Sequence, residues 1–532
     1  MLSLLIFLPL IAALFILVLP SRFQQHFKYI TLGVSVIQFV LSLFIYLKFN
    51  SFAFAAGINK ESQYQLLEKL PWIRLNLGNI GNLEIDYFLG IDGLSMPFLI
   101  LSALVTFVAT LASWEIKTKL KAYFSLFLLL NTAVIGVFCA LDFFLFYIFY
   151  ELMLLPLYFL IGIWGGIRRE YAAIKFFLYT LFGSVFMLLV IIGLYFSVIN
   201  PATGNHTFNM ILMMDPANYA DGSIFSAIAA KNLFGISARL LAFIVLFVAF
   251  AIKVPIVPLH TWLPDAHVEA PTPVSIILAG LLLKVGGYGI IRVCYSIFPD
   301  SAMLSAWWIG LIGVISIIYG ALNALAQTDL KRLIAYSSVS HMGFVLLGIA
   351  SSTIEGVSGA MLQMISHGGL SAMLFFLVGM IYERVKDREI ANFSGLAEIM
   401  PQFTAFVIVA FFASLGLPGF SAFMAEAFTL IGAFTSEQVN GLIPRWMSVV
   451  ASIGILLSAT YFLWTLQRMF FGQPRLKGAA DWLSKLSDIN AREKLALIPL
   501  VALALALGIF PSLLFDKMNA SVVAFVQLIS GS

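Results

Sequence analysis

The segment AIKVPIVPLHTWLPDAHVEAPTPVS, residues 251–275, joins the end of a long apolar run to a stretch with five prolines and two histidines. Pro255 and Pro258 follow Lys253 closely, and each proline removes a backbone donor from a helix. In hydrocarbon, the carbonyls freed in this way can be satisfied only by protein or by trapped water. The segment therefore predicts a broken helix with a hydrated pocket beside a buried lysine.

The composition of the chain is that of a membrane protein. Of its 532 residues, 61% are hydrophobic and 11% are charged, and the mean hydropathy is +1.01. Soluble domains carry about 25% charged residues, so a water-soluble globule is excluded. The formal net charge of +4 is too small to indicate a nucleic-acid partner.

Fourteen stretches are long enough to cross a bilayer, which takes about 20 apolar residues each. They are 2–20, 29–48, 90–113, 121–139, 141–163, 171–199, 238–262, 270–297, 302–325, 330–350, 355–382, 402–435, 446–472 and 495–515. We expect the chain to end soon after the fourteenth.

A second apolar run is interrupted in the same way as the first. In FFASLGLPGFSAFMAEAF, residues 411–428, Gly416, Pro418 and Gly419 break the run, and Glu426 follows. The two breaks fall in spans 7 and 12, which suggests two related units of five spans each. Because an odd number of crossings ends on the opposite side of the membrane, the second unit would run inverted relative to the first. We expect an all-α polytopic membrane protein with two inverted five-helix repeats, spans 4–8 and 9–13. The expected division is 1–113 with an outer loop at 49–89, then 121–297, 302–472 and 473–532.

The basic residues predict how the chain lies in the membrane. Loops after the odd-numbered spans hold most of the lysines and arginines, so these loops are expected in the cytoplasm and both termini on the periplasmic side. This pattern is typical of a multi-pass protein of a bacterial inner membrane. In the outer loop, Gly78, Gly81 and Asn82 are turn signals that predict a small hairpin.

Six ionisable side chains fall deep within predicted spans. They are Glu151, Lys253, Lys284, His341, His367 and Glu426. A lysine or carboxylate at that depth costs about 2.5–3.5 kcal/mol, so such residues commonly mark ion paths. Their spread over six spans favours a proton path over ion pairs that only lock helices together. A haem held by the two histidines is a further alternative, for which the chain offers no other sign.

The segment after the first break carries His260, Asp265, His267 and Glu269. We interpret it as an irregular, polar entrance through which protons reach the buried lysines from the cytoplasm. A metal site is the alternative, which the prolines disfavour because they make the backbone irregular. The two cysteines, Cys139 and Cys294, form no CxxC motif, which excludes a redox centre held by cysteine.

Four stretches resemble the antiporter-like membrane subunits of respiratory complex I, the proton-pumping NADH:quinone oxidoreductase. They are KVPIVPLHTWLPDAHVEAPTPVSIILAGLLLKVGGYG (253–289), DFFLFYIFYELMLLPLYFLIGIWGG (142–166), AQTDLKRLIAYSSVSHMGFVLLG (326–348) and GIDGLSMPFLILS (90–102). The resemblance spans nearly all fourteen predicted helices and is strongest to the branch lettered M, also called chain 4. The L branch has a long lateral C-terminal helix, which we do not expect here.

The resemblance implies roles for individual residues. It implies that Glu151 pairs with Lys253 and modulates the proton affinity of that lysine, and that Lys284 is the central lysine of span 8. Glu426 matches the outward exit group, and His341 and His367 match histidines on the axis that links these sites.

The resemblance also implies a place in a larger assembly. It implies no cofactor in this chain, with flavin, iron–sulfur clusters and quinone on partner subunits. The partners it implies are other membrane-arm subunits, neighbouring antiporter-like subunits among them, and the lipid bilayer. Two alternatives remain: a subunit of a sodium/proton antiporter or membrane-bound hydrogenase, and a structural spacer without transport. The electron donor of the assembly does not follow from this chain.

Overall fold

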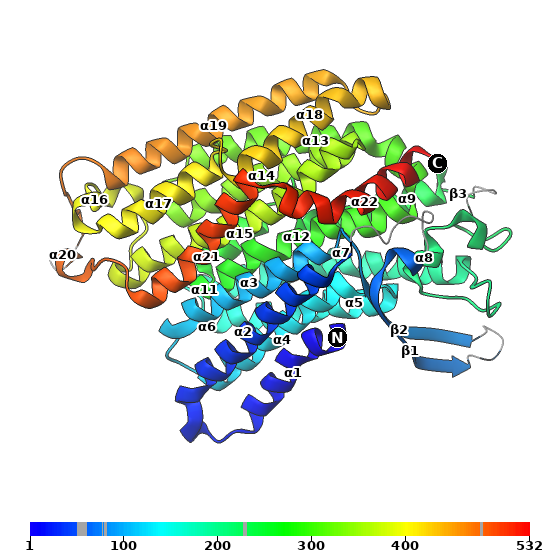
Figure 1. Cartoon of the computed structure of the whole chain (residues 1–532), viewed down its shortest axis with the longest axis horizontal. Helices are drawn as coiled ribbons and strands as arrows, with labels where there is room; N and C mark the ends of the chain where they lie inside the picture. Colours follow the sequence, from blue (N-terminus) through cyan, green and yellow to red (C-terminus); the bar gives the residue numbers. More distant parts are fainter. Residues whose placement is uncertain (51–60, 77, 79–81, 227–230, 479–481, 532) are drawn as a thin grey trace.

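The fold is a bundle of membrane-spanning helices with a small β-hairpin at one end (Figure 1). The computed structural model describes residues 1–50, 61–76, 78, 82–226, 231–478 and 482–531. Among these, eleven helices are long and apolar enough to cross a bilayer, and two shorter apolar helices, α1 (Leu2–Val18) and α17 (Pro401–Ser414), accompany them. The expectation of a helical polytopic membrane protein is confirmed.

Nine further predicted spans form single unbroken helices. They are α2 (Gln24–Lys48), α3 (Met96–Ala112), α4 (Leu120–Cys139), α7 (Arg169–Ser197), α13 (Pro299–Leu325), α14 (Leu330–Ser351), α15 (Ile354–Val385), α19 (Arg445–Phe470) and α21 (Ala491–Ile509). The third span begins at Met96 rather than at residue 90, because the chain before it belongs to a strand. The division of the chain into four parts stays a prediction.

The two predicted breaks are present. Span 7 consists of α9 (Ala238–Lys253) and α10 (Trp262–Glu269), and span 12 consists of α17 and α18 (Ser421–Val439). The expectation of an irregular segment after the first break is wrong over residues 262–269, which are helical. Pro264 lies in the first turn of α10, where the missing N–H of a proline costs no helical hydrogen bond.

Two further irregularities were not predicted. Span 5 is interrupted at Met153, between α5 (Phe143–Leu152) and α6 (Leu154–Trp164). Span 8 alternates between α-helical and π-helical turns. It consists of α11 (Thr272–Ile277), η6 (Leu278–Leu282), α12 (Leu283–Gly289) and η7 (Ile290–Tyr295). Such π-helical turns are rare and frequently occur at functional sites.

The outer loop forms the predicted hairpin. Strands β1 (Gln65–Asn76) and β2 (Asn82–Ile91) pair antiparallel, whereas Gly81 and residues 51–60 lie outside the described residues. The carboxylate of Glu68 in β1 accepts hydrogen bonds from the first residues of the chain, including the Leu2 amide at 2.8 Å. The N-terminus is therefore fixed on the hairpin side of the bundle (Figure 1).

An amphipathic helix that was not predicted, α22 (Ser512–Ser530), follows α21. This helix packs against the ends of other spans on the hairpin side. Lys517 donates to the Phe49 carbonyl at 2.8 Å, and Ser521 accepts from the Gly93 amide at 3.0 Å. These contacts hold the C-terminal helix on the same side as the N-terminus (Figure 1).

Short elements complete the chain between the spans. The short helices are α8 (Met210–Met213), α16 (Leu396–Ile399) and α20 (Trp482–Lys485), and the short strands are β3 (Asn232–Leu233) and β4 (Ile236–Ser237). The 3-10 helices are η1 (Ser21–Phe23), η2 (Glu61–Gln63), η4 (Ser113–Glu115), η5 (Pro216–Asn218) and η8 (Ile390–Asn392).

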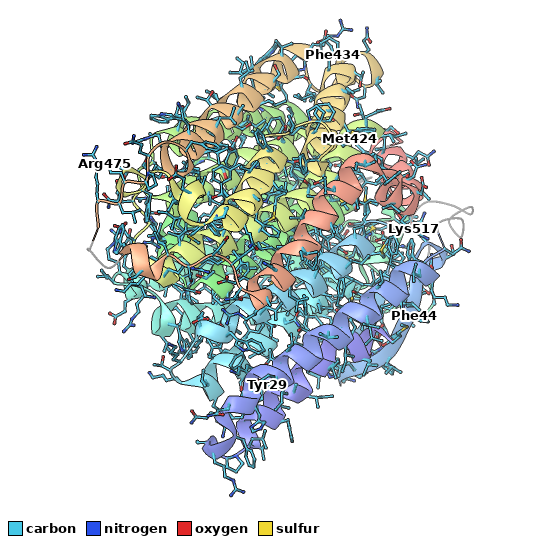
Figure 2. All side chains as sticks on the ribbon, turned by 60° about the vertical axis from the view of Figure 1, so that its left-hand side comes forward. Tyr29, Phe44, Met424, Phe434, Arg475 and Lys517 are labelled. Atoms are coloured by element: carbon cyan, nitrogen blue, oxygen red, sulfur yellow. The ribbon has the colours of Figure 1, made fainter. Side chains whose placement is uncertain are left out.

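Large apolar side chains are exposed along the flanks of the bundle. On α7, Phe182 is 60% exposed and Leu189 is 62% exposed. Figure 2 shows Tyr29 and Phe44 on the outward side of α2, at the edge of the molecule. An exposed apolar surface of this extent marks contact with lipid or with another membrane protein.

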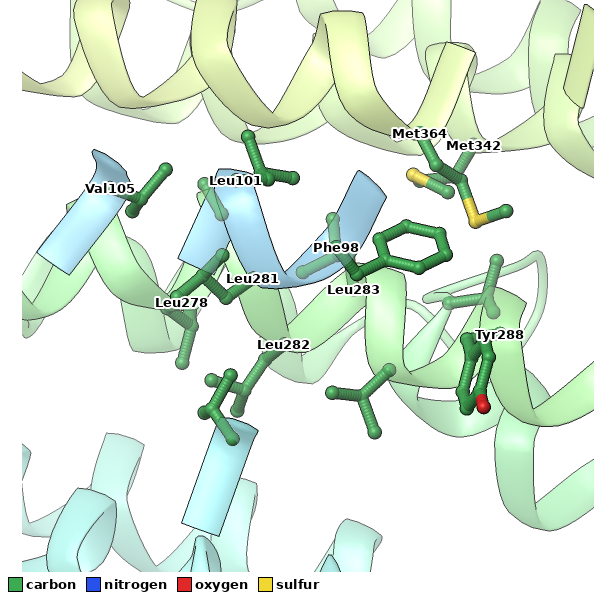
Figure 3. Close-up of a cluster of buried hydrophobic side chains, with 14 of the residues drawn as sticks. Phe98, Leu101, Val105, Leu278, Leu281, Leu282, Leu283, Tyr288, Met342 and Met364 are labelled. Carbon is green, nitrogen blue, oxygen red and sulfur yellow. The ribbon is translucent and has the colours of Figure 1, made fainter. Parts of the chain in front are cut away.

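Span 8 lies at the centre of the bundle, and every residue from Thr272 to Tyr295 is buried. Figure 3 shows its leucines packed against α3, with Leu278 and Leu281 near Leu101 and Val105. Lipid is as apolar as leucine, so close packing rather than the hydrophobic effect holds such helices together. The glycines of span 8 permit this approach, because a Cβ added at Gly286 would lie 2.8 Å from the Val254 amide nitrogen.

We therefore expect Gly286→Ala to destabilise the protein by about 1–3 kcal/mol, the usual cost of overpacking. The added methyl group would meet backbone atoms of span 7, which cannot rotate away. Gly33→Ala in α2 is the matched control, because nothing lies within 4 Å of its added Cβ. Thermal unfolding of the purified assembly compares the two, and equal midpoints would contradict the packing argument.

Candidate functional site

The centre of the site is the ammonium group of Lys284, near the middle of the buried span 8. Its Nζ donates to the Ala279 carbonyl at 2.6 Å and lies 2.7 Å from His367 Nδ1. Ala279 belongs to the π-helical turn η6, whose altered winding changes the pairing of backbone carbonyls. The irregular turn therefore presents an oxygen to the buried cation, and the histidine of α15 presents a nitrogen.

His341 of α14 extends this centre away from span 8. Its ring centroid lies 5.4 Å from that of His367, and its Nε2 has no hydrogen-bond partner among the described residues. Between the two histidines is a small cavity lined also by Ser338, Ser371 and Gln363. The centre of a water-sized sphere can occupy about 10 Å³ of this cavity, which is room for about one water molecule.

Lys253 ends α9 at the break in span 7 and is 1% exposed. Its Nζ lies 3.2 Å from the centre of the Tyr150 ring and donates to the Tyr150 carbonyl at 3.3 Å. A cation over an aromatic face in a buried site is stabilised by about 2 kcal/mol. The ring of Tyr150 thus takes the place next to Lys253 that the sequence analysis gave to a carboxylate.

Glu151 lies in the last turn of α5 and is partly buried. Its Oε1 has no hydrogen-bond partner in the described part of the chain, and no ion pair within 4 Å joins it to Lys253 there. The expected pair is therefore separated rather than in contact in this structure.

Glu426 lies in α18, after the break in span 12, and is 2% exposed. Its Oε2 packs against Gly416, where an added Cβ would lie 2.6 Å away, and Gly416 has a φ of +80°. Its Oε1 has no hydrogen-bond partner within the described ranges. The Tyr461 hydroxyl of α19 is likewise buried without a hydrogen-bond partner among the described residues.

The three residues predicted at the entrance have different surroundings. Asp265 is ion-paired, whereas His260 and His267 pack on aromatic rings. Asp265 forms ion pairs with Lys175 at 2.7 Å and with Arg332 at 3.5 Å, which join α10 to α7 and α14. His260 packs near the Tyr319 ring, 5.2 Å between centroids. His267 is fully buried and stacks on Phe375, 4.2 Å between ring centroids.

The start of span 5, at the hairpin end of the bundle, carries one more buried carboxyl, Asp142. It caps α5 by accepting from the amides of Phe144 and Leu145, each at 3.0 Å, and it accepts from the Asp86 amide of the hairpin at 3.2 Å. Asp142 thus couples the hairpin to the helix that carries Glu151.

Sequence reasoning missed several of these groups. Tyr150 could have been identified from the sequence, because it is the aromatic residue directly before the buried glutamate. Lys331 was counted only as a cytoplasmic charge, although it is 4% exposed and donates to the Ala270 carbonyl at 2.6 Å. No group of three His, Cys, Asp or Glu side chains that could hold a metal occurs among the residues the structure describes.

A bundle with interrupted helices and a line of buried lysine, histidine and glutamate defines an ion-translocating membrane protein. Residues 140–458 match the model of the family described as NADH:quinone oxidoreductase/Mrp antiporter, and residues 66–140 match the amino terminus of NADH-ubiquinone oxidoreductase chain 4. The chain belongs to this family, in the branch of the antiporter-like M, or chain 4, subunits of NADH:quinone oxidoreductase.

Full-length relatives agree with this placement. The chain is 39% identical to NADH-quinone oxidoreductase subunit M of Rhodobacter capsulatus, over 99% of this chain and 96% of the relative. It is 38% identical to NAD(P)H-quinone oxidoreductase chain 4 2 of Thermosynechococcus vestitus, over 100% of this chain and 92% of the relative.

Solved structures show the same fold. A chain of respiratory complex I from Thermus thermophilus with bound NADH matches with a TM-score of 0.81 and 27% identity, over 99% of this chain and all of that one. A chain of the Mrp complex from Dietzia sp. matches with a TM-score of 0.78 over 99% of this chain and 98% of that one. At 20% identity, the second likeness shows the fold alone.

The contact between Lys253 and the Tyr150 ring leads to a direct test. We expect Tyr150→Leu to lower proton translocation, because the buried ammonium loses about 2 kcal/mol of stabilisation by the ring face. Tyr150→Phe keeps the ring and should translocate protons close to the unmodified rate. Both variants are compared in membrane vesicles with a pH-sensitive dye, and equal losses would contradict a role for the ring.

Proposed function

We propose that the chain translocates protons across a bacterial inner membrane as the M-type subunit of NADH:quinone oxidoreductase and carries no redox chemistry itself. The observation that supports this most directly is the contact between Lys284 and His367 in the buried centre of the bundle. An ammonium donates a proton to the lone pair of a neutral imidazole at this distance. The two groups can therefore exchange a proton where water has almost no access.

The proposed path connects the two broken spans through this centre. Protons enter from the cytoplasm near His260, Asp265 and His267, and load Lys253 or Lys284. They cross by His367, the neighbouring cavity and His341, and leave through Glu426 toward the periplasm. The unpartnered His341 Nε2 and Glu426 Oε1 support this order, because each has a lone pair free to accept a proton.

Glu151 is proposed to control the charge on Lys253. When the carboxylate approaches, it stabilises the ammonium, and when it withdraws, the ammonium loses its counter-charge and releases its proton. The separation of the two groups in this structure corresponds to the withdrawn arrangement, with the ring of Tyr150 as the remaining partner. The interruption of span 5 at Met153 is the element that would move.

We propose that flavin, iron–sulfur clusters and quinone reside on partner subunits, whose electron transfer supplies the free energy. The neighbours would be other membrane-arm subunits, antiporter-like subunits among them, and they would cover part of the exposed apolar flank. Both termini would lie on the periplasmic side. The packing of α1 and α22 at the hairpin end is consistent with one side for both.

A sodium/proton antiporter subunit is the second candidate, because the matching family model covers Mrp antiporters as well as NADH:quinone oxidoreductase. A sodium ion requires several oxygen ligands, whereas the central groups Lys284, His341 and His367 present nitrogen atoms, which suit protons. Sodium-dependent quenching of a pH-sensitive dye in vesicles distinguishes the two. A translocation rate that is independent of sodium supports the proton subunit, and a strict requirement for sodium would overturn it.

The role of Glu151 is tested with Glu151→Gln in membranes that contain the whole complex. We expect proton translocation and quinone reduction to fall together while the complex stays assembled, because Lys253 loses its variable counter-charge. Glu151→Lys should abolish translocation. Glu170→Gln, an exposed carboxylate on α7, is the matched control and should change neither rate. Unchanged rates of proton translocation and quinone reduction in Glu151→Gln would reduce Glu151 to a structural residue, as the spacer hypothesis requires.

A further inference from the structure

A deep crevice opens at the end of the bundle opposite the hairpin, which is the cytoplasmic end in the proposed orientation. The centres of water molecules can occupy about 520 Å³ of it. It lies between the end of span 5, the start of span 8, and the adjoining ends of α14 and α15. Its charged lining includes Glu269, Lys331, Glu383 and Glu115. Of the residues predicted at the entrance, Glu269 lines this crevice, whereas His260, Asp265 and His267 do not.

Lys331 forms the buried wall of the crevice. Its Nζ donates to the Ala270 carbonyl at 2.6 Å, and within the described ranges no carboxylate lies within 4 Å of it. An ammonium that is 4% exposed and has no ion pair is costly, which a purely structural role would not explain.

Glu383 of α15 lies across the crevice, and it has no hydrogen bond or ion pair among the residues the structure describes. The charged side chains next to Glu383 form ion pairs with other residues. Glu115 binds Arg492 at 2.6 Å, and Arg384, the next residue of α15, binds Glu493 at 2.9 Å. Glu383 is thus a carboxylate free to take up a proton beside a hydrated opening.

His267 lies behind this wall, between the crevice and the central site. Both of its ring nitrogens are buried without a hydrogen-bond partner in the described part of the chain. Val268 and Glu269, which follow it in α10, line the crevice, and its ring stacks on Phe375 of α15, the helix that carries His367. His267 is therefore a buried base whose helix borders the crevice and whose ring packs on the helix of the central site.

We propose that this crevice is the cytoplasmic mouth of the proton path. Glu383 takes a proton from water in the crevice, Lys331 holds the water that carries it inward, and His267 passes it on to the pair of Lys284 and His367. No electron moves in these steps, and each group returns to its starting state when the next proton arrives. This inference rests on the proposed function. In it, Glu383 rather than the ion-paired Asp265 is the group that collects protons.

The position of the mouth is tested by labelling Ile116→Cys with a charged, membrane-impermeant thiol reagent in membranes that contain the whole complex. Ile116 lines the crevice and is half-buried, whereas the native Cys139 and Cys294 are fully buried and should stay unlabelled. We expect reagent on the cytoplasmic side to label this cysteine and stop proton translocation. Ser21→Cys, exposed in the first loop, should be labelled from the same side without loss of translocation. Unlabelled Ile116→Cys, labelling from the periplasmic side, or full translocation after labelling would overturn the proposal.

The collecting group is tested with Glu383→Gln, again in the assembled complex. Removal of a proton-transfer group is expected to slow translocation by about tenfold or more. Glu383→Asp should restore part of the rate, and the exposed control Glu170→Gln should keep all of it. An unchanged rate in Glu383→Gln would overturn the crevice as the mouth. That result would leave the proposed function intact, because the function is judged separately by Glu151→Gln.

Discussion

The burial of the Lys284 ammonium is the constraint on which the rest of the structure depends. A cation at the centre of a membrane protein is retained only where other groups replace its water. Here the carbonyl of Ala279 and the nitrogen of His367 replace that water. Each of these two groups is held in place by a different part of the fold. The carbonyl comes from a π-helical turn, and the histidine comes from the long buried helix α15. The site at Lys284 therefore depends both on the local winding of span 8 and on the packing of α15 against it.

The two interrupted helices hold buried ionisable groups in two chemically different ways. In the first half of the chain, the break ends α9 at Lys253, whose charge rests on the aromatic face of Tyr150. In the second half, the break contains Gly416, whose missing side chain makes room for the carboxylate of Glu426. A cation and an acid thus occupy comparable breaks on either side of the central lysine. In the proposed path, the two breaks therefore present groups of opposite chemistry, a base at one and an acid at the other.

Much of this architecture follows from the sequence. Apolar length predicts the spans, and the proline and glycine clusters predict both breaks, because these effects are local. The contacts of Lys253 and Asp265 were not predictable in the same way. Tyr150, Lys175 and Arg332 reach them from other helices, and no local pattern encodes which of several partners lies nearer. The amphipathic α22 was missed because its polar face lowers its mean hydropathy, and the π-helical turns were missed because they have no compositional signal.

The central claim is that Lys284 carries protons rather than only a structural charge. Its most direct test is proton translocation per electron by Lys284→Met in membranes with the complex fully assembled, since methionine fills the space of the side chain without its ammonium. The account predicts that translocation through this subunit is lost, whereas the exposed-site variant Lys119→Met is unaffected. An assembled Lys284→Met complex that moves as many protons per electron as the unmodified one would contradict it.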